Sequence, residues 1–182
     1  MVSVDAGILS LLLHPTAKPP DDPATKKPVE RAHERIEQLI EDLDGAKERI
    51  IVPAPALAEF LVLAAEDGPQ YLNEIALLSH VYIQPLDQMA AIELAAMEIL
   101  ARKKGGKRHP LTAATAWQKV KVDRQIIAIS KLHQAKTIYS DDRDLKEIAE
   151  DIGIKAVSTW ELPLPKSTTP LLDDAGEPLD LS

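Results

Sequence analysis

The fold is decided by residues 122–157, which read VDRQIIAISKLHQAKTIYSDDRDLKEIAEDIGIKAV. Apolar residues at helical spacing predict a helix over 122–133. Two short apolar runs, at 137–139 and 155–157, predict strands, and a short charged helix over 144–151 lies between them. Strands that alternate with helices in this way are typical of parallel βαβ units, in which helices cover both faces of one sheet.

The rest of the chain repeats the same alternation. Further strands are predicted at residues 1–4, 50–52 and 81–83, and further helices at residues 6–13, 29–43, 53–65, 70–78 and 87–104. We therefore expect an α/β protein with three layers, α/β/α, around a central parallel sheet of about five strands. Residues 1–162 are predicted to form one domain, and residues 163–182 a Pro-rich acidic C-terminal tail.

The composition excludes several classes of protein. The chain has 182 residues, of which 45% are hydrophobic and 27% charged, so disorder throughout is excluded. It has no cysteine, which excludes a disulfide scaffold, thiolate nucleophiles and zinc–cysteine sites, and fits a reducing compartment. No apolar run approaches the ~18 residues of a membrane span, and the N-terminus lacks the basic start of a signal peptide. We expect a cytoplasmic protein without a membrane partner.

The charge is distributed unevenly along the chain. The formal net charge is −8, but residues 102–124 hold eight basic side chains and one acid, which gives this segment +7 and leaves −15 for the rest. Such asymmetry is typical of a polyanion-binding stripe on an otherwise repelling surface, and a solvated basic loop is the alternative. Candidate phosphate contacts are Lys107, Arg108, Lys119, Lys121, Arg124 and Arg143.

One carboxylate stands in an unexpected place. Glu59 is the only ionisable residue in residues 52–65, a predicted helix that is apolar almost all round and should therefore be buried. A buried carboxylate needs a cation, a proton or an opening to solvent, because burying it unpaired costs several kcal/mol. The alternative is a glutamate exposed on a partly solvated helix.

Other acids lie where strands end or helices begin. Asp5 follows the first strand, Asp123 opens the predicted helix of residues 124–133, and residues 140–144 place three aspartates after the fourth strand. Ligands bind beyond the carboxyl ends of parallel strands, so these acids can converge at one edge of the sheet. Ordinary explanations remain for each: Asp5 and Asp123 can be N-caps, and the 140–144 loop can simply be solvated.

Together these acids indicate a hard-cation site. Carboxylate oxygens, without cysteine and without paired histidines, suit Mg²⁺ or Mn²⁺ better than Zn²⁺ or copper. Divalent ions held by carboxylates activate water and stabilise charge during phosphodiester hydrolysis. The basic segment beside Asp123 would then supply contacts to the phosphates.

Five segments resemble those of a known family, the PIN domain, which includes the VapC-type toxins of toxin–antitoxin pairs. The resemblance covers about residues 1–162 and rests on residues 2–5 (VSVD), 53–61 (PAPALAEFL), 81–87 (VYIQPLD), 123–130 (DRQIIAIS) and 140–144 (SDDRD). It implies a parallel sheet between helices. It also implies a metal-dependent endoribonuclease that cleaves single-stranded RNA, often as a homodimer and, in a toxin, with a cognate antitoxin protein.

Carried over position by position, the resemblance implies catalytic and metal-binding roles for Asp5, Glu59, Asp123 and Asp142. Asp144 would be a supporting acid. Ser140 stands where the family usually has threonine, and it would bind a metal-bound water or orient Asp142.

The chain also departs from the family pattern. Ala6-Gly7 replaces a hydroxyl residue and an asparagine that commonly follow the first aspartate, and the loops over residues 14–28 and 105–122 are longer than a minimal toxin needs. These departures leave open a PIN-like scaffold that binds RNA or protein with weak or no catalysis. A metal-dependent phosphohydrolase on a similar sheet is a third reading.

Overall fold

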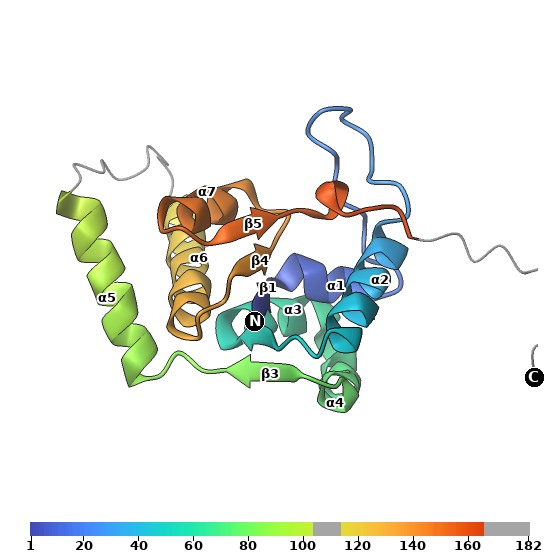
Figure 1. Ribbon diagram of the computed structural model, residues 1–182, viewed down its shortest axis with the longest axis horizontal. Coiled ribbons are helices and arrows are strands. Elements are labelled where there is room, and N and C mark those ends of the chain that lie inside the picture. The colour runs from blue at the N-terminus through green and yellow to red at the C-terminus, as the bar shows by residue number, and fades with distance from the viewer. Residues whose placement is uncertain (104–113, 166–182) are drawn as a thin grey trace, which may run out of the picture.

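The computed structural model describes residues 1–103 and 114–165, and these form a three-layer α/β/α fold around one sheet (Figure 1). All pairings in the sheet are parallel, and the strand order is β3-β2-β1-β4-β5. The strands are β1 (Val2–Val4), β2 (Ile50–Pro53), β3 (Val81–Gln84), β4 (Thr137–Tyr139) and β5 (Lys155–Val157). The predicted fold class is confirmed, with five parallel strands.

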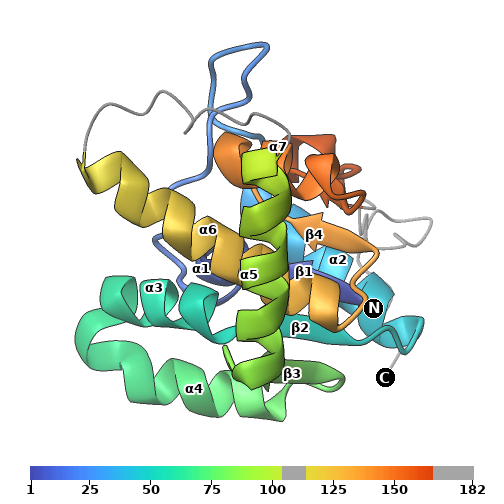
Figure 2. The same cartoon turned by 90° about the vertical axis from the view of Figure 1, so that its left-hand side faces the viewer.

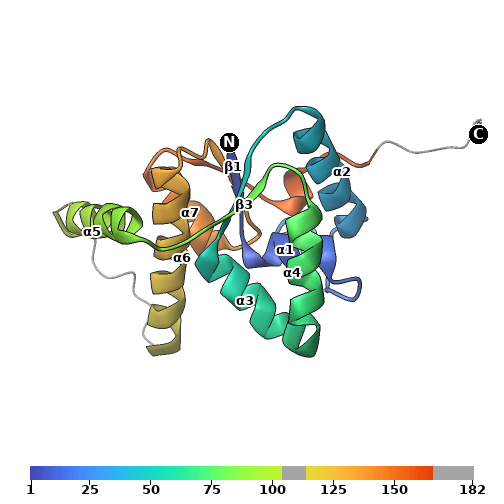
Figure 3. The same cartoon turned by 90° about the horizontal axis from the view of Figure 1, so that it is seen from below.

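Helices cover both faces of the sheet. Figure 3 shows α1, α2 and α4 on one side of the strands and α5, α6 and α7 on the other. The helix α3 packs against both α1 and α6. The helices are α1 (Ala6–Leu13), α2 (Ala32–Gly45), α3 (Ala54–Ala64), α4 (Gly68–Leu77), α5 (Gln88–Lys103), α6 (Ala114–Leu132) and α7 (Arg143–Asp151), with short 3₁₀ turns η1 (Ala65–Asp67) and η2 (Thr159–Glu161).

The strand β1 shows why the sheet is buried on both faces. Val2 and Val4 pack into the core that α1 and α2 share, because alternate residues of a strand point to the same face. Ser3 points to the opposite face, where the Ser130 hydroxyl of α6 donates a hydrogen bond to the Ser3 hydroxyl at 2.8 Å. A buried serine pair therefore joins the central strand to the helix that carries Asp123.

The helix α6 corrects one prediction. Sequence patterning placed a basic loop over residues 105–122 and Asp123 at a helix N-terminus, but α6 already begins at Ala114, so Asp123 lies inside it. Residues 114–122 contain neither proline nor glycine, and helix propagation past such residues requires no special signal. The N-cap explanation of Asp123 is therefore wrong.

The helix α3 corrects a second prediction. Its apolar composition predicted burial all round, yet Val62 and Leu63 are 80% and 66% exposed, and Glu59 is exposed as well. The opposite face of α3 packs Leu57 and Phe60 into the core. One face of this helix thus presents apolar side chains around an accessible carboxylate.

Some predictions lie outside the described residues. These are the possible phosphate contacts Lys107 and Arg108, and the C-terminal tail from residue 166 onward. Within the described ranges, none of the helices combines the length and apolar character that a membrane crossing demands.

Candidate functional site

The carboxyl edge of the sheet gathers the predicted site residues. Asp5 directly follows β1, Asp142 follows β4, and Glu59 lies on α3, which follows β2. Asp123 reaches the same region from α6. Parallel strands end at a common edge, which is why residues far apart in the sequence meet there.

Asp5 is a buried carboxylic acid, only 7% exposed. One oxygen, Oδ1, accepts a hydrogen bond from the Ile8 amide at 2.9 Å, so Asp5 does cap α1. The other oxygen, Oδ2, accepts a hydrogen bond from the Ser140 hydroxyl. Burial raises the pKa of Asp5 to about 7 although both hydrogen bonds oppose the shift, and the nearby charges of Asp141 and Asp142 raise it further.

Asp123 is the least satisfied acid of the site. It is 4% exposed, and within the described part of the chain its Oδ2 is buried without a hydrogen-bond partner. Burial raises its pKa to about 7, the charges of Asp142 and Glu59 add to the rise, and Lys119 opposes it. An unpartnered buried carboxylate oxygen is costly, so a proton or a cation at this atom would stabilise the fold.

Glu59 and Lys119 lie at the accessible side of the same cluster. Partial burial raises the pKa of Glu59, Asp142 raises it further and Lys119 lowers it. The Lys119 ammonium is 2.5 Å from Asp142 Oδ2 and 3.7 Å from Asp144 Oδ2. Burial lowers the pKa of Lys119, but the hydrogen bond and charge of Asp142 outweigh burial, so its pKa is raised overall. Lys119 is therefore a cation held among the acids.

The loop after β4 fixes Ser140 and Asp142. Asp142 caps α7, because its Oδ1 accepts from the Asp144 amide at 2.9 Å. The Ser140 hydroxyl in turn accepts from the Asp142 amide at 3.0 Å while it donates to Asp5. The predicted supporting residue Ser140 thus connects two of the predicted ligands directly.

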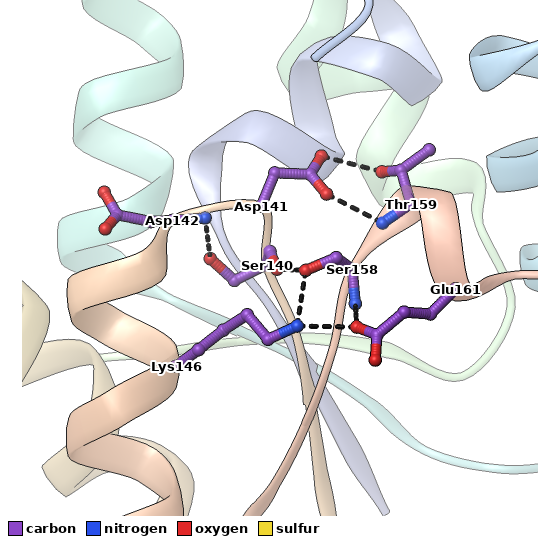
Figure 4. Close-up of polar contacts among 7 residues, drawn as sticks. All are labelled: Ser140, Asp141, Asp142, Lys146, Ser158, Thr159 and Glu161. Carbon is purple, nitrogen blue, oxygen red and sulfur yellow. Dashed lines mark hydrogen bonds and ion pairs between the residues drawn. The ribbon is translucent and has the colours of Figure 1, made fainter. Parts of the chain in front are cut away.

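A set of hydrogen bonds that the sequence did not predict, called the brace below, holds this loop against residues 158–159, directly after β5 (Figure 4). Asp141 accepts two hydrogen bonds from Thr159, one from its amide and one from its hydroxyl, both at 2.7 Å. The Ser158 hydroxyl donates to the Ser140 carbonyl at 2.9 Å, and Lys146 donates to Ser158 at 2.6 Å. Three aspartates within four residues hinted at a second role, but the partner of Asp141 is 18 residues away and no local pattern identifies it.

Replacing Thr159 should show how much the brace contributes. Thr159→Val removes the hydroxyl that Asp141 Oδ2 accepts from and leaves a partly buried carboxylate oxygen unpaired, so we expect unfolding free energy to fall by about 1–3 kcal/mol in urea titrations. Thr159→Ser keeps the hydroxyl and should stay close to the wild type. The exposed Thr25→Val is the matched control, and equal stability of the two valine variants would contradict the brace.

The acids are electrostatically coupled but not assembled as a metal site. No group of three or more His, Asp or Glu side chains in the described residues is close enough to hold an ion. The charge of Asp142 nevertheless raises the pKa values of Asp5, Glu59 and Asp123, so the four predicted ligands lie close enough to interact electrostatically. Their oxygen donors and the unpaired Asp123 Oδ2 fit a divalent cation. Binding one would require the carboxylates to approach each other and Lys119 to leave Asp142.

The predicted phosphate contacts differ in their surroundings. Lys119 lies in the cluster and Lys121 is exposed two residues further along α6. Arg124 is paired with Glu98 of α5, and the exposed Arg143 is paired with Glu147, 2.9 Å away on α7. Of the predicted phosphate contacts within the described residues, Lys119 is the one that an ion pair joins to Asp142 and Asp144.

Comparisons with known proteins identify a family and two solved structures with a similar fold. A family model, the PIN domain, matches residues 29–151. The fold is similar to that of DNA-bound VapBC from Salmonella typhimurium, with 15% identity and a TM-score of 0.51 over 87% of this chain and 99% of that one. It is also similar to VapBC2 from Rickettsia felis bound to a DNA fragment from its promoter, with 14% identity and a TM-score of 0.54 over 87% and 98%. No curated protein matches the sequence.

Proposed function

Because this chain belongs to the PIN domain family, whose model matches about two thirds of its length, we propose that it is a metal-dependent endoribonuclease. Its reaction would be hydrolysis of phosphodiester bonds in single-stranded RNA. The observation that supports this most is the pair of buried acids, Asp5 and Asp123, at the carboxyl edge of the sheet beside an accessible lysine, Lys119. Nucleases of this kind are hydrolases that need such charged groups around a scissile phosphate.

The four acids would hold the ion. Asp5, Glu59, Asp123 and Asp142 supply the carboxylate oxygens that Mg²⁺ or Mn²⁺ prefers, and the ion would supply water activation and neutralisation of charge on the phosphate. With pKa values of about 7, Asp5 and Asp123 hold protons over part of the neutral range and would release them when the ion binds. The hydroxyl of Ser140 orients Asp5, and Asp144 stays a supporting acid near Lys119.

The basic side chains would bind the RNA backbone. We propose that Lys119, once separated from Asp142, contacts the phosphate nearest the acids, because its ammonium is already beside them. Further phosphate contacts are proposed along the same segment and at the start of α7: Lys107, Arg108, Lys121, Arg124 and Arg143.

A scaffold that binds RNA or protein with weak catalysis is the second candidate, and one observation favours it. Both oxygens of Asp5 already accept hydrogen bonds, from Ile8 and Ser140, while Ala6-Gly7 supplies no side-chain donor or ligand next to it. Tight RNA binding without metal-dependent turnover would favour this candidate.

The similar structures suggest a protein partner. VapBC is a toxin–antitoxin complex, and we propose that this chain is the toxin of such a pair and binds a cognate antitoxin. A cavity of about 440 Å³ beside the site would suit an antitoxin segment, since α1, α3 and the Pro-rich loop line it with Leu11, Leu63 and Pro20.

We also propose that the chain acts in the cytoplasm, consistent with its lack of cysteine, and that it forms a homodimer.

Metal dependence and substrate class can be tested together. The purified chain should cleave single-stranded RNA in Mn²⁺ or Mg²⁺, because the acids repel a phosphate unless a cation lies among them, and an excess of EDTA should abolish cleavage. Gel electrophoresis of end-labelled RNA measures the rate, with single-stranded DNA and a chromogenic phosphomonoester as comparison substrates. Cleavage that persists in EDTA would refute the proposal, and turnover of the phosphomonoester alone would indicate a phosphohydrolase.

A further inference from the structure

Another cavity, of about 430 Å³, is lined by the Pro-rich loop (residues 14–28), α7 and the 3₁₀ turn η2, which contributes Trp160. Figure 1 shows this loop beside η2, and Figure 2 shows it rising above α7. Asp141 also lines the cavity, and it directly precedes Asp142, one of the four candidate ligands. The cavity is therefore a neighbour of the candidate site.

The Pro-rich loop is a fixed wall of this cavity. The Val29 amide donates a hydrogen bond to the Pro20 carbonyl at 2.9 Å, which closes the loop at its base. The loop is also held to α2, because His33 Nε2 lies 2.9 Å from the Ala17 carbonyl oxygen. Prolines restrict the backbone further. A wall that is formed before a ligand arrives reduces the entropy lost on binding.

Most charged side chains around the cavity already have partners. Both oxygens of Asp141 accept hydrogen bonds from Thr159. Arg143 pairs with Glu147 at 2.9 Å, and Lys146 donates to a serine and a glutamate at and beside η2. These groups stabilise the cavity walls and are not available to a ligand without losing an existing contact.

Two carboxylates remain available, Asp21 on the loop and Glu150 on α7. Both residues are exposed, and within the part of the chain that the structure describes neither side chain makes a hydrogen bond or an ion pair. Carboxylates accept hydrogen bonds and repel phosphate. The group that fits between them therefore carries N–H donors and no negative charge.

The apolar part of the lining consists of rings, those of Pro20, Pro23 and Trp160. Unstacked RNA bases bind against flat side chains of this kind and are read at their Watson–Crick edges. A cationic peptide side chain would also suit two carboxylates, but the Lys146 ammonium already lies over the Trp160 ring, 5.2 Å from its centroid, and would repel a second cation. The lining therefore favours a base.

We propose that this cavity is a nucleobase subsite selective for guanine, a role that rests on the RNA cleavage proposed above. The Watson–Crick edge of guanine carries two adjacent donors, N1–H and the 2-amino group, and one carboxylate can accept from both. Adenine and cytosine present a donor beside an acceptor, and uracil a donor between two acceptors, so each of them would place an acceptor against the carboxylate. Asp21 and Glu150 are therefore the specificity-determining residues of the subsite.

Nucleosides test the cavity without metal and without phosphate, and so independently of cleavage. In ¹H–¹⁵N NMR spectra of the full-length protein in EDTA, guanosine should shift the Trp160 indole N–H signal, assigned with Trp160→Phe. Its Kd should be at least about tenfold lower than that of inosine, which lacks the 2-amino group, or of adenosine. Equal affinities, or no shift with guanosine, would overturn the proposal. Tighter binding of arginine amide than of guanosine would also overturn it and would indicate a peptide ligand.

The two carboxylates can be tested together. In the double variant Asp21→Asn, Glu150→Gln, guanosine and inosine should bind with Kd values within about twofold of each other, because an amide has one acceptor oxygen and no charge. Asp151→Asn is the matched control, since Asp151 is the exposed neighbour of Glu150 on α7 and does not line the cavity. The control should keep the preference for guanosine. A double variant that also keeps it would refute the assignment of Asp21 and Glu150.

Cleavage assays separate a failure of the subsite from a failure of the nuclease. In Mn²⁺, a uracil-rich RNA with one guanine should be cut at a fixed distance from that guanine, at least about tenfold faster than the same RNA with inosine there. Guanosine binding without RNA cleavage would contradict the nuclease and support the subsite. Metal-dependent cleavage that ignores guanine, together with no guanosine binding, would overturn the subsite and leave the nuclease standing.

Discussion

Asp123→Asn should lower the rate of Mn²⁺-dependent RNA cleavage by at least ~100-fold, the usual scale for removing a group that stabilises charge in a transition state. The amide keeps the shape of the side chain but supplies no negative charge for a cation. Because Asp123 Oδ2 is buried without a partner in the described residues, the loss should come from the site itself and not from unfolding.

The same variant should be more stable than the wild type when no metal is present. An amide stays neutral, whereas the Asp123 carboxylate must be buried as a charge above its pKa of about 7. We expect a gain of about 1–3 kcal/mol in EDTA at pH 8, measured by urea unfolding. Asp151→Asn, an exposed position at the far end of α7, is the matched control and should change neither quantity. An Asp123→Asn protein that is both inactive and unstable would show instead that Asp123 is a structural residue.

The metal-free protein should lose stability as the pH rises from about 5 to 8. Asp5 and Asp123 have pKa values of about 7 in the folded protein and near 3.8 when unfolded, so the folded state binds more protons between these values. Stability therefore falls with rising pH across that window. At about 1.4 kcal/mol per pKa unit, two such groups allow a change of a few kcal/mol. Glu161 has a lowered pKa, which acts in the opposite direction, but below this window.

Urea titrations in EDTA at several pH values measure this slope. Asp123→Asn should reduce it, because one of the two titrating groups is removed. Mn²⁺ should stabilise the wild type most at pH 8, where the acids are ionised and no protons need to leave. Stability that rises from pH 5 to 8 in EDTA would contradict the placement of Asp5 and Asp123 as buried acids.

Much of the fold was predictable because its signals are local. The strands at 137–139 and 155–157 and the helix at 6–13 were predicted with the bounds that the structure shows, since short apolar runs and turn residues mark them directly. The start of α6 was predicted too late in the sequence. Residues 114–122 include charged side chains but no proline or glycine that would mark a helix boundary. The surroundings of Glu59 were misjudged because composition does not say which face of α3 other helices cover.

That the candidate acids lie at one edge of the sheet was predictable, but their contacts with one another were not. Asp5 and Asp142 follow strands, and parallel strands end at one edge, so the order of elements was enough to bring them together. The hydrogen bond from Ser140 to Asp5 and the brace between Asp141 and Thr159 join residues 135 and 18 positions apart. Contacts over such separations depend on the register of strands, which no single segment encodes.

By itself the sequence determined the order of helices and strands and the acids that follow them, because periodicity and turn residues act within a few positions. Only the tertiary structure decided which acids are buried, that Asp123 has an unpaired oxygen, that Lys119 lies among the carboxylates, and that the Pro-rich loop and α7 line one cavity. Burial and charge pairing are sums over neighbours from many segments, and those neighbours exist only once the chain has folded.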